Sequence, residues 1–237
     1  MSTAAPRAPM DSAVVVARSR EDVVVGPEIV RHRRFSRLVH WTVALTFFLS
    51  LLTGLPIWTP VFGWMAHLFG GLSVCRLLHP WLGLAFFIAS LVQFFEWRSD
   101  MRVESWEKDW AGPRVVRYMR YDASADDPRT GKYNGGQKLY FWAVSLGAVG
   151  LLLSGILMWF PSGPRWLMQL AFIVHDFTFI CFVASLVFHI YLSTAAEPGT
   201  YGSMIRGTVT RTWARVHHPR WYREVTGEEP RPNTRHV

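Results

Sequence analysis

Residues 166–194, WLMQLAFIVHDFTFICFVASLVFHIYLST, contain the feature that decides the fold. The stretch is long and apolar enough to cross a hydrocarbon layer as a helix, which needs about 20 residues. It nevertheless contains two histidines, His175 and His189. Ionisable side chains inside a membrane segment are costly and usually functional. These two histidines are therefore candidates for a functional site.

The spacing of the two histidines places them on one face of a helix. His175 and His189 are 14 positions apart. Over that interval an α-helix rises about 21 Å and ends about 40° from its starting direction. One helix thus offers a ligand near each surface of the membrane.

Three further segments share this length and apolarity. The four predicted spans are residues 38–58, 77–97, 139–160 and 166–194. Of the 237 residues, 50% are hydrophobic and 18% charged, against about 25% charged in a typical soluble domain. This composition excludes a disordered chain and argues against a soluble α/β enzyme. Two cysteines are too few for a disulfide framework or a four-thiolate iron–sulfur cluster. We expect an all-α, integral membrane four-helix bundle.

The basic residues orient this bundle. Of the 25 Lys and Arg residues, 23 lie in the two tails and the central connection, and only Arg76 and Arg165 lie in the other two connections. The positive-inside rule places the basic side, with both termini, in the cytoplasm. The first thirty residues lack a continuous apolar region, so we expect no cleaved signal peptide. The basic tails suit lipid headgroups, and no nucleic-acid partner is expected.

The domain organisation follows from the same pattern. We expect a membrane domain over residues 30–225. Residues 1–29 and 226–237 contain no apolar span, and we expect them to be a flexible N-terminal extension and a flexible C-terminal tail.

Four histidines lie in or at the edge of the predicted spans. With this topology His40 and His189 lie near the cytoplasmic face, and His79 and His175 near the outer face. Two facing imidazoles are the axial ligands of a six-coordinate haem, whereas a zinc site would need more ligands. We therefore expect two haems, one between His79 and His175 and one between His40 and His189. Gly83, one turn after His79, would leave room for a macrocycle.

The connection before the third span ends in GKYNGGQK, residues 131–138. Its two adjacent glycines let backbone approach a ligand closely, and Asn134 and Gln137 offer amide groups at the membrane surface. A quinone could bind there through its carbonyl groups. The alternative is a turn that only starts a helix.

These motifs resemble the cytochrome b556 (gamma) subunits of respiratory formate dehydrogenases over about residues 30–225. The resemblance rests on RLVHW (37–41), HPWLG (79–83), GKYNGGQK (131–138), the pair His175 and His189, and FHIYLST (188–194).

The resemblance implies a bacterial inner-membrane protein with two haems b that reduces menaquinone or ubiquinone at the cytoplasmic side. It implies two partners, an iron–sulfur subunit and a molybdenum- or tungsten-containing catalytic subunit. It also implies haem ligation by the same pairs of histidines, and a quinone site formed by Asn134, Gly136 and Gln137 near His189.

On this reading the chain carries electrons from the iron–sulfur partner to quinone and contributes no catalytic residue for formate. Whether it counts as an enzyme then depends on the complex. Two alternatives remain. One is the cytochrome b subunit of a membrane-bound hydrogenase or another quinone-linked dehydrogenase. The other is a haem-free anchor or transporter, although no inverted repeat or broken span is visible.

Overall fold

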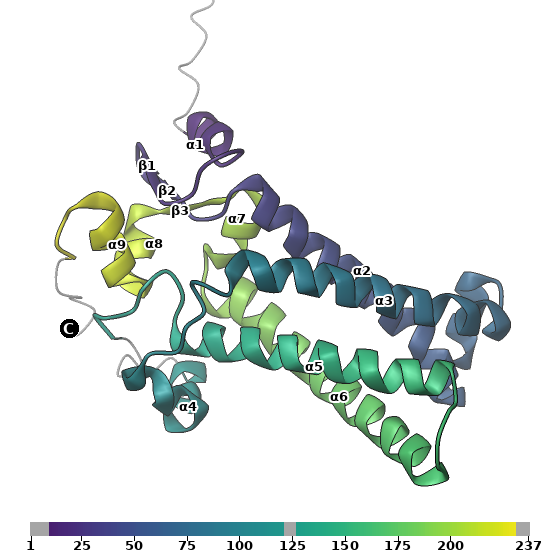
Figure 1. The fold of residues 1–237 in the computed structure, drawn as a ribbon. Coiled ribbons are helices and arrows are strands. Elements are labelled where there is room, and N and C mark those ends of the chain that lie inside the picture. Colours follow the sequence, from purple (N-terminus) through teal and green to yellow (C-terminus); the bar gives the residue numbers. More distant parts are fainter. Residues whose placement is uncertain (1–9, 121–126, 231–237) are drawn as a thin grey trace, which may run out of the picture. The chain divides into compact units, whose positions relative to one another are not determined.

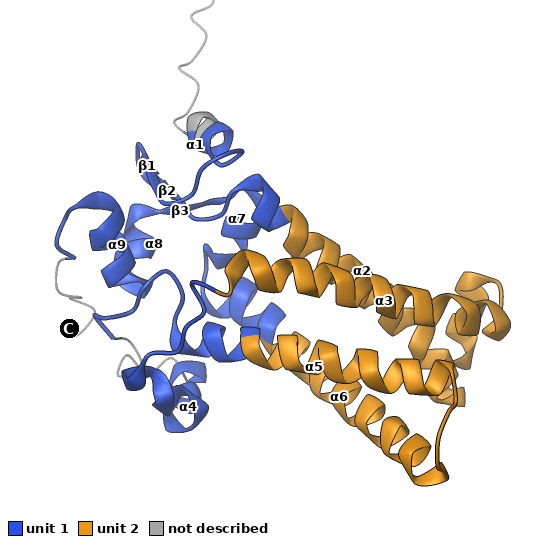
Figure 2. Ribbon diagram, viewed as in Figure 1, with its two compact units in different colours: residues 1–37, 99–141, 189–237 blue, residues 38–98, 142–188 orange. Residues whose placement is uncertain are grey.

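The computed structural model describes residues 10–120 and 127–230. The chain divides into two compact units (Figure 2). Unit 1 combines residues 1–37, 99–141 and 189–237, and unit 2 combines residues 38–98 and 142–188.

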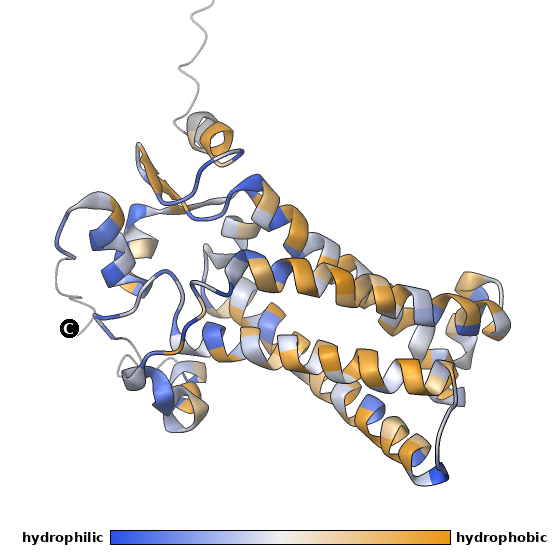
Figure 3. Ribbon diagram, in the orientation of Figure 1, coloured by the Kyte–Doolittle hydropathy of each residue, from blue (hydrophilic) through white to orange (hydrophobic). Residues whose placement is uncertain are grey.

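Four helices are long and apolar enough to cross a membrane, which confirms the four predicted spans. They are α2 (Arg34–Trp58), α3 (Leu72–Trp97), α5 (Gly135–Trp159) and α6 (Arg165–Tyr191), and α6 continues into a π-helical turn, η4 (Leu192–Ala196). Apolar residues dominate these helices (Figure 3). The first three begin about four residues earlier than predicted, because helical backbone extends past the apolar run into polar or small residues.

Unit 2 contains most of these four helices, which lie alongside one another (Figures 1 and 2). Its core contains the buried residues Phe86, Ala148 and Phe182, from α3, α5 and α6. Gly147 permits this packing, because a Cβ there would lie 2.4 Å from the Phe182 ring. A 3-10 helix, η1 (Pro60–Phe69), connects α2 to α3.

Unit 1 is built from short elements. They are α1 (Met10–Val16), β1 (Val23–Val25), β2 (Glu28–Val30), η2 (Ser105–Ala111), α4 (Pro113–Met119), α7 (Thr200–Ile205), β3 (Thr208–Thr210), α8 (Arg211–His217) and α9 (Pro219–Thr226). The strands form one antiparallel sheet in the order β1-β2-β3. Ile29 pairs with Val209, so the sheet joins the two ends of the chain.

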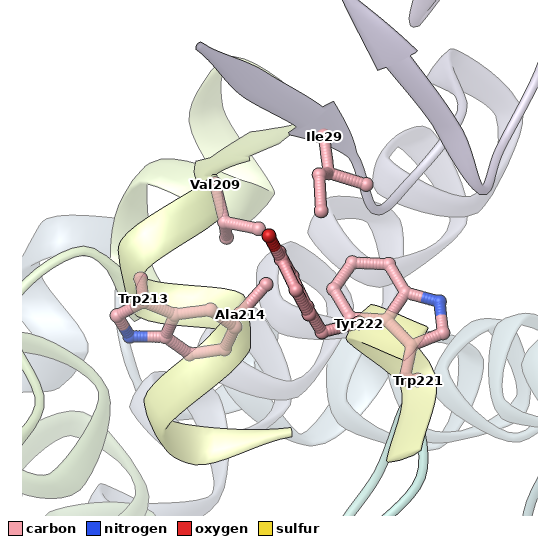
Figure 4. Close-up of a cluster of buried hydrophobic side chains, with 6 residues drawn as sticks. All are labelled: Ile29, Val209, Trp213, Ala214, Trp221 and Tyr222. Carbon is pink, nitrogen blue, oxygen red and sulfur yellow. The ribbon is translucent and has the colours of Figure 1, made fainter. Parts of the chain in front are cut away.

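A hydrophobic cluster consolidates this sheet (Figure 4). It consists of Ile29, Val209, Trp213, Ala214, Trp221 and Tyr222, all buried. The two tryptophans come from α8 and α9, so these helices cover one face of the sheet. Burial of such aromatic side chains dominates core energetics.

The N-terminal segment differs from the expectation of a flexible extension. Structure is present from residue 10, where α1, β1 and β2 occupy most of the range 10–30. Residues 1–9 and 231–237 lie outside the described residues. The difference has a physical reason: β2 is stabilised by pairing with β3, far along the chain, and a local pattern does not reveal such pairing.

Candidate functional site

Unit 2 brings His79 of α3 and His175 of α6 together. Their ring centres are 6.2 Å apart and their planes are inclined by 71°. An iron bound by two imidazoles through bonds of about 2 Å holds the ring centres roughly 6 Å apart. The separation of the two rings therefore fits a pair of axial haem ligands.

The hydrogen bond of His79 orients its ring. Its Nδ1 lies 3.0 Å from the carbonyl oxygen of Ser50. A carbonyl only accepts, so Nδ1 carries the proton and Nε2 keeps the lone pair. Thr53 Oγ1 lies 3.4 Å from the same Nδ1. Such partners fix the tautomer of a metal-binding histidine.

His175 is oriented in a similar way by a hydroxyl group. Ser154 Oγ donates to the carbonyl of Gly150 at 2.7 Å and lies 2.9 Å from His175 Nδ1. Because the single hydroxyl proton is used, Oγ accepts from the Nδ1–H of His175. The Nε2 atom of His175 is again the available ligand.

Glycines leave space beside both rings. A Cβ at Gly54 would lie 2.8 Å from His79 Cε1, which is too close for any side chain. A Cβ at Gly155 would lie 3.5 Å from His175 Cε1, and one at Gly83 would meet nothing within 4 Å. The space at Gly83 agrees with the room expected there for a macrocycle.

The donor set fits a haem. Among residues 10–120 and 127–230, no group of three or more His, Cys, Asp or Glu side chains could hold a metal ion. A porphyrin supplies four ligands itself, so two imidazoles complete the coordination of its iron.

The second predicted pair, His40 and His189, falls in different units. In unit 2, the His40 ring contacts Trp41 edge-on at 5.2 Å and lies 6.5 Å from Trp97. In unit 1, the His189 ring stacks on Tyr140 at 5.1 Å, with planes inclined by 10°.

The quinone-site candidates Asn134 and Gln137 form a capping box at the start of α5. The backbone N–H of Gln137 donates to Asn134 Oδ1 at 2.9 Å, and the backbone N–H of Asn134 donates to Gln137 Oε1 at 3.0 Å. The helix-starting turn considered above is therefore present. The cap uses both amide oxygens but not the amide NH2 groups, which are donors.

The glycines of this motif pack against protein. A Cβ at Gly135 would lie 2.3 Å from the Trp110 indole, and one at Gly136 would lie 2.9 Å from it. Lys138 follows on α5, and its Nζ bonds both carboxylate oxygens of Glu107, at 2.9 and 2.8 Å. The side chains of this ion pair are almost completely buried.

A second carboxylate, that of Glu104 at the N-cap of η2, binds Arg220 of α9. Arg220 donates to both oxygens of Glu104, at 3.1 and 2.6 Å. The hydrogen bonds that Glu104 accepts from Arg220 and from Trp106 lower the pKa of Glu104 to about 2. Glu104 is therefore ionised at any physiological pH.

Sequence reasoning missed the partners of these groups. Ser50, Gly54 and Ser154 were not anticipated beside the histidines, and Tyr140 was not anticipated beside His189. Gly54 and Ser154 carry a weak signal, as small residues within apolar spans. Ser50 acts through its backbone carbonyl, for which a sequence gives no signal at all.

Comparison with known proteins gives a consistent family. The family model described as prokaryotic cytochrome b561 matches residues 31–207. The formate dehydrogenase cytochrome b556(fdo) subunit of Escherichia coli K12 is 34% identical over 201 residues, which cover 83% of this chain and 93% of that protein. The nitrate-inducible cytochrome b556(Fdn) subunit of the same strain is 32% identical over 205 residues, covering 85% and 93%. The formate dehydrogenase cytochrome b556 subunit of Haemophilus influenzae is 31% identical over 211 residues, covering 87% of each chain.

Proposed function

The chain belongs to the prokaryotic cytochrome b561 family, and from this premise we propose that it is the membrane cytochrome b subunit of a formate dehydrogenase. Its family and its four membrane helices make it a multi-pass protein of the bacterial inner membrane. The relatives that are named as formate dehydrogenase subunits align with it over most of both chains. Membership in a cytochrome b family implies haem b.

The observation that carries the proposal is the His79–His175 pair, with ring centres 6.2 Å apart and both Nδ1 atoms hydrogen-bonded. These residues would hold the haem near the outer face. By depth along α2 and α6, His40 and His189 would hold a second haem near the cytoplasmic face. Haem supplies reversible one-electron transfer, so two haems would connect a donor outside to an acceptor inside.

The acceptor is proposed to be menaquinone or ubiquinone, bound where α5 begins. The amide NH2 groups of Asn134 and Gln137 and the backbone N–H of Gly136 in the first helical turn are donors that a quinone carbonyl can use. Tyr140, one turn after Gln137, stacks on His189. Unit 1 thus brings these donors close to a proposed ligand of the cytoplasmic haem.

Two partners follow from the proposal. An iron–sulfur subunit would deliver electrons at the outer face, and a molybdenum- or tungsten-containing subunit would oxidise formate. The sidedness rests on the distribution of Lys and Arg, which puts both termini in the cytoplasm. The chain can be purified from its native membrane together with its partners. Finding a hydrogenase there in place of these subunits would overturn formate dehydrogenase as the electron donor.

A haem count tests the proposal. We expect the difference spectrum of dithionite-reduced and oxidised protein to show low-spin b haem at two per chain. His175→Ala should lose one of them and retain the other. A folded, full-length preparation without haem would contradict the proposed function.

A further inference from the structure

The backbone that leads into α5 is held by donors from both ends of the chain. Residues 130–132 present three consecutive carbonyl groups. The first accepts from the backbone N–H of Arg220 at 3.0 Å, the second from Nδ1 of His218 at 2.7 Å, and the third from the guanidinium of Arg31 at 2.7 Å. The path of this segment is therefore set largely by residues outside it.

His218 is suited to act as a fixed donor. The residue is 1% exposed, and the partner of Nδ1 is a carbonyl oxygen, so Nδ1 must carry a proton. Burial, with the nearby charge of Arg31, lowers the pKa of His218 well below its usual value. The ring therefore stays neutral, and the hydrogen bond to Gly131 persists at physiological pH.

Arg31 is equally fixed. It is 1% exposed, and its guanidinium carbon lies 4.7 Å from the ring centre of Trp213, 5.5 Å from that of Tyr133 and 5.9 Å from that of Trp221. Both tryptophans belong to the cluster in Figure 4. Stacking among aromatic faces restrains a guanidinium that already donates to the loop.

The side chain of Arg220 also packs against the loop. A Cβ at Gly131 would lie 2.7 Å from Arg220 Nη2, so only glycine allows this approach. The same guanidinium is held by both oxygens of Glu104. Residues 218–220 thus hold two of the three carbonyl groups and pack against Gly131, while Arg31 holds the third carbonyl.

We propose that His218 is a positioning residue of the quinone site: by fixing the carbonyl of Gly131 it sets the direction in which the Asn134–Gln137 cap, three residues further on, presents its amide donors. The inference rests on the proposed function, because it assumes that a quinone binds at this cap. His218 lies outside residues 31–207, which the family model matches, so family membership does not assign it this role.

The test measures quinone dependence separately from haem content. The complex, with its partner subunits, is placed in phospholipid vesicles and reduced with just enough dithionite to reduce the haems, so that none remains to react with quinone. Decylubiquinone or menadione is then added. The rate of haem oxidation is recorded against quinone concentration. We expect His218→Leu to raise the half-saturating concentration about tenfold, the effect of one hydrogen bond lost between the displaced cap and quinone, with the maximal rate and the haem spectrum nearly unchanged.

Two variants separate positioning from folding. His218→Asn places an amide N–H near the position of Nδ1, and it should return the half-saturating concentration to within about threefold of the original. His217→Leu is the matched control, because it removes the neighbouring imidazole, whose Nδ1 lies 3.9 Å from the carboxylate of Glu197. It should leave the quinone dependence unchanged.

A third variant perturbs the same contact from the loop. Gly131→Ala forces Arg220 away and should also raise the half-saturating concentration, even if His218→Leu fails to fold. The positioning role alone would be overturned if the quinone dependence were unchanged in His218→Leu or in Gly131→Ala. It would also be overturned if His218→Asn had a half-saturating concentration as high as that of His218→Leu. Failure of the original protein to react with either quinone would instead overturn quinone reduction by this chain, and the positioning role with it.

Discussion

At the scale of single residues, the two proposed ligands of the outer haem differ in what orients them. His79 donates to the backbone carbonyl of Ser50, which no substitution can delete, whereas His175 donates to the hydroxyl of Ser154. The Ser154 hydroxyl can be removed without touching a ligand. The effect of orienting the His175 ring can therefore be tested while both histidines are kept.

We expect Ser154→Ala to weaken haem retention at the outer site by about 10- to 100-fold, since loss of a group that hydrogen-bonds to a metal ligand typically costs that much affinity. The measurement is haem transfer from purified protein to apomyoglobin. Thr46→Val is the control, because the Thr46 hydroxyl donates to carbonyls of its own helix. Equal haem loss from both variants would count against the role of Ser154.

The glycines beside the histidines give a matched pair of substitutions. Gly54→Ala should displace the His79 ring and abolish the outer haem, because the added Cβ would lie 2.8 Å from Cε1. Gly155→Ala should retain it, because its Cβ would make an ordinary contact at 3.5 Å. The measurement is the haem-to-protein ratio of each purified variant. Retention of two haems by Gly54→Ala would show that the ring has room to move.

At the scale of elements, the start of α5 is joined to η2 by a buried ion pair. The Lys138 side chain is 4% exposed and that of Glu107 is fully buried. Such a pair adds little net stability over apolar residues, but breaking it leaves an uncompensated buried charge.

Lys138→Met alone should lower the free energy of unfolding by about 3–5 kcal/mol, because Glu107 remains buried and unpaired. The double variant Glu107→Gln and Lys138→Met should recover much of this loss. Thermal unfolding in detergent, followed by circular dichroism, compares the three proteins. A double variant less stable than Lys138→Met would refute the explanation by unpaired charge.

The pairing of Glu104, the N-cap of η2, with Arg220 of α9 predicts a pH dependence of stability. The folded pKa of Glu104, about 2, is below its ordinary value of 4.5. The contribution of this pair to stability is therefore fully present above about pH 4.5 and is lost as the pH falls toward 2. The protection of the backbone amides of residues 220–226, measured as exchange relative to the intrinsic rate at each pH, should fall across this window. Glu104→Gln should remove the Glu104-dependent part of this loss of protection, and an unchanged profile would contradict the role of Glu104.

At the scale of the whole molecule, each unit has its own core. Unit 1 is consolidated by the cluster around Trp213 and Trp221, and unit 2 by the cluster around Phe86 and Phe182. The sheet of unit 1 draws on both ends of the chain. We therefore expect damage to one core to be felt mainly in its own unit.

Trp213→Ala should destabilise unit 1 by about 3–5 kcal/mol while His79 and His175 keep their haem. Limited trypsin digestion of the protein in vesicles should then cleave faster in residues 205–223, with no loss of outer-site haem. Trp64→Ala is the control, because Trp64 is 65% exposed in unit 2. Loss of the outer haem in Trp213→Ala would show that the units are energetically coupled.

The sequence alone determined the four membrane helices, the histidines available as ligands and the basic asymmetry that predicts orientation. These features are readable because each depends on contiguous or periodic residues. A segment in hydrocarbon must satisfy its backbone internally, so its apolar run predicts a helix. His175 and His189 share a face because helix geometry fixes their relation.

The tertiary structure decided what those residues contact. It pairs His79 with the Ser50 carbonyl and His175 with Ser154, and it joins β2 to β3. It also shows that the glycines of GKYNGGQK accommodate Trp110 and Arg220. These contacts link residues 21 to about 180 positions apart, or act through backbone atoms that every residue type shares. A local sequence pattern predicts neither distant pairs nor contacts of backbone atoms. Only folding brings such groups within contact distance of one another.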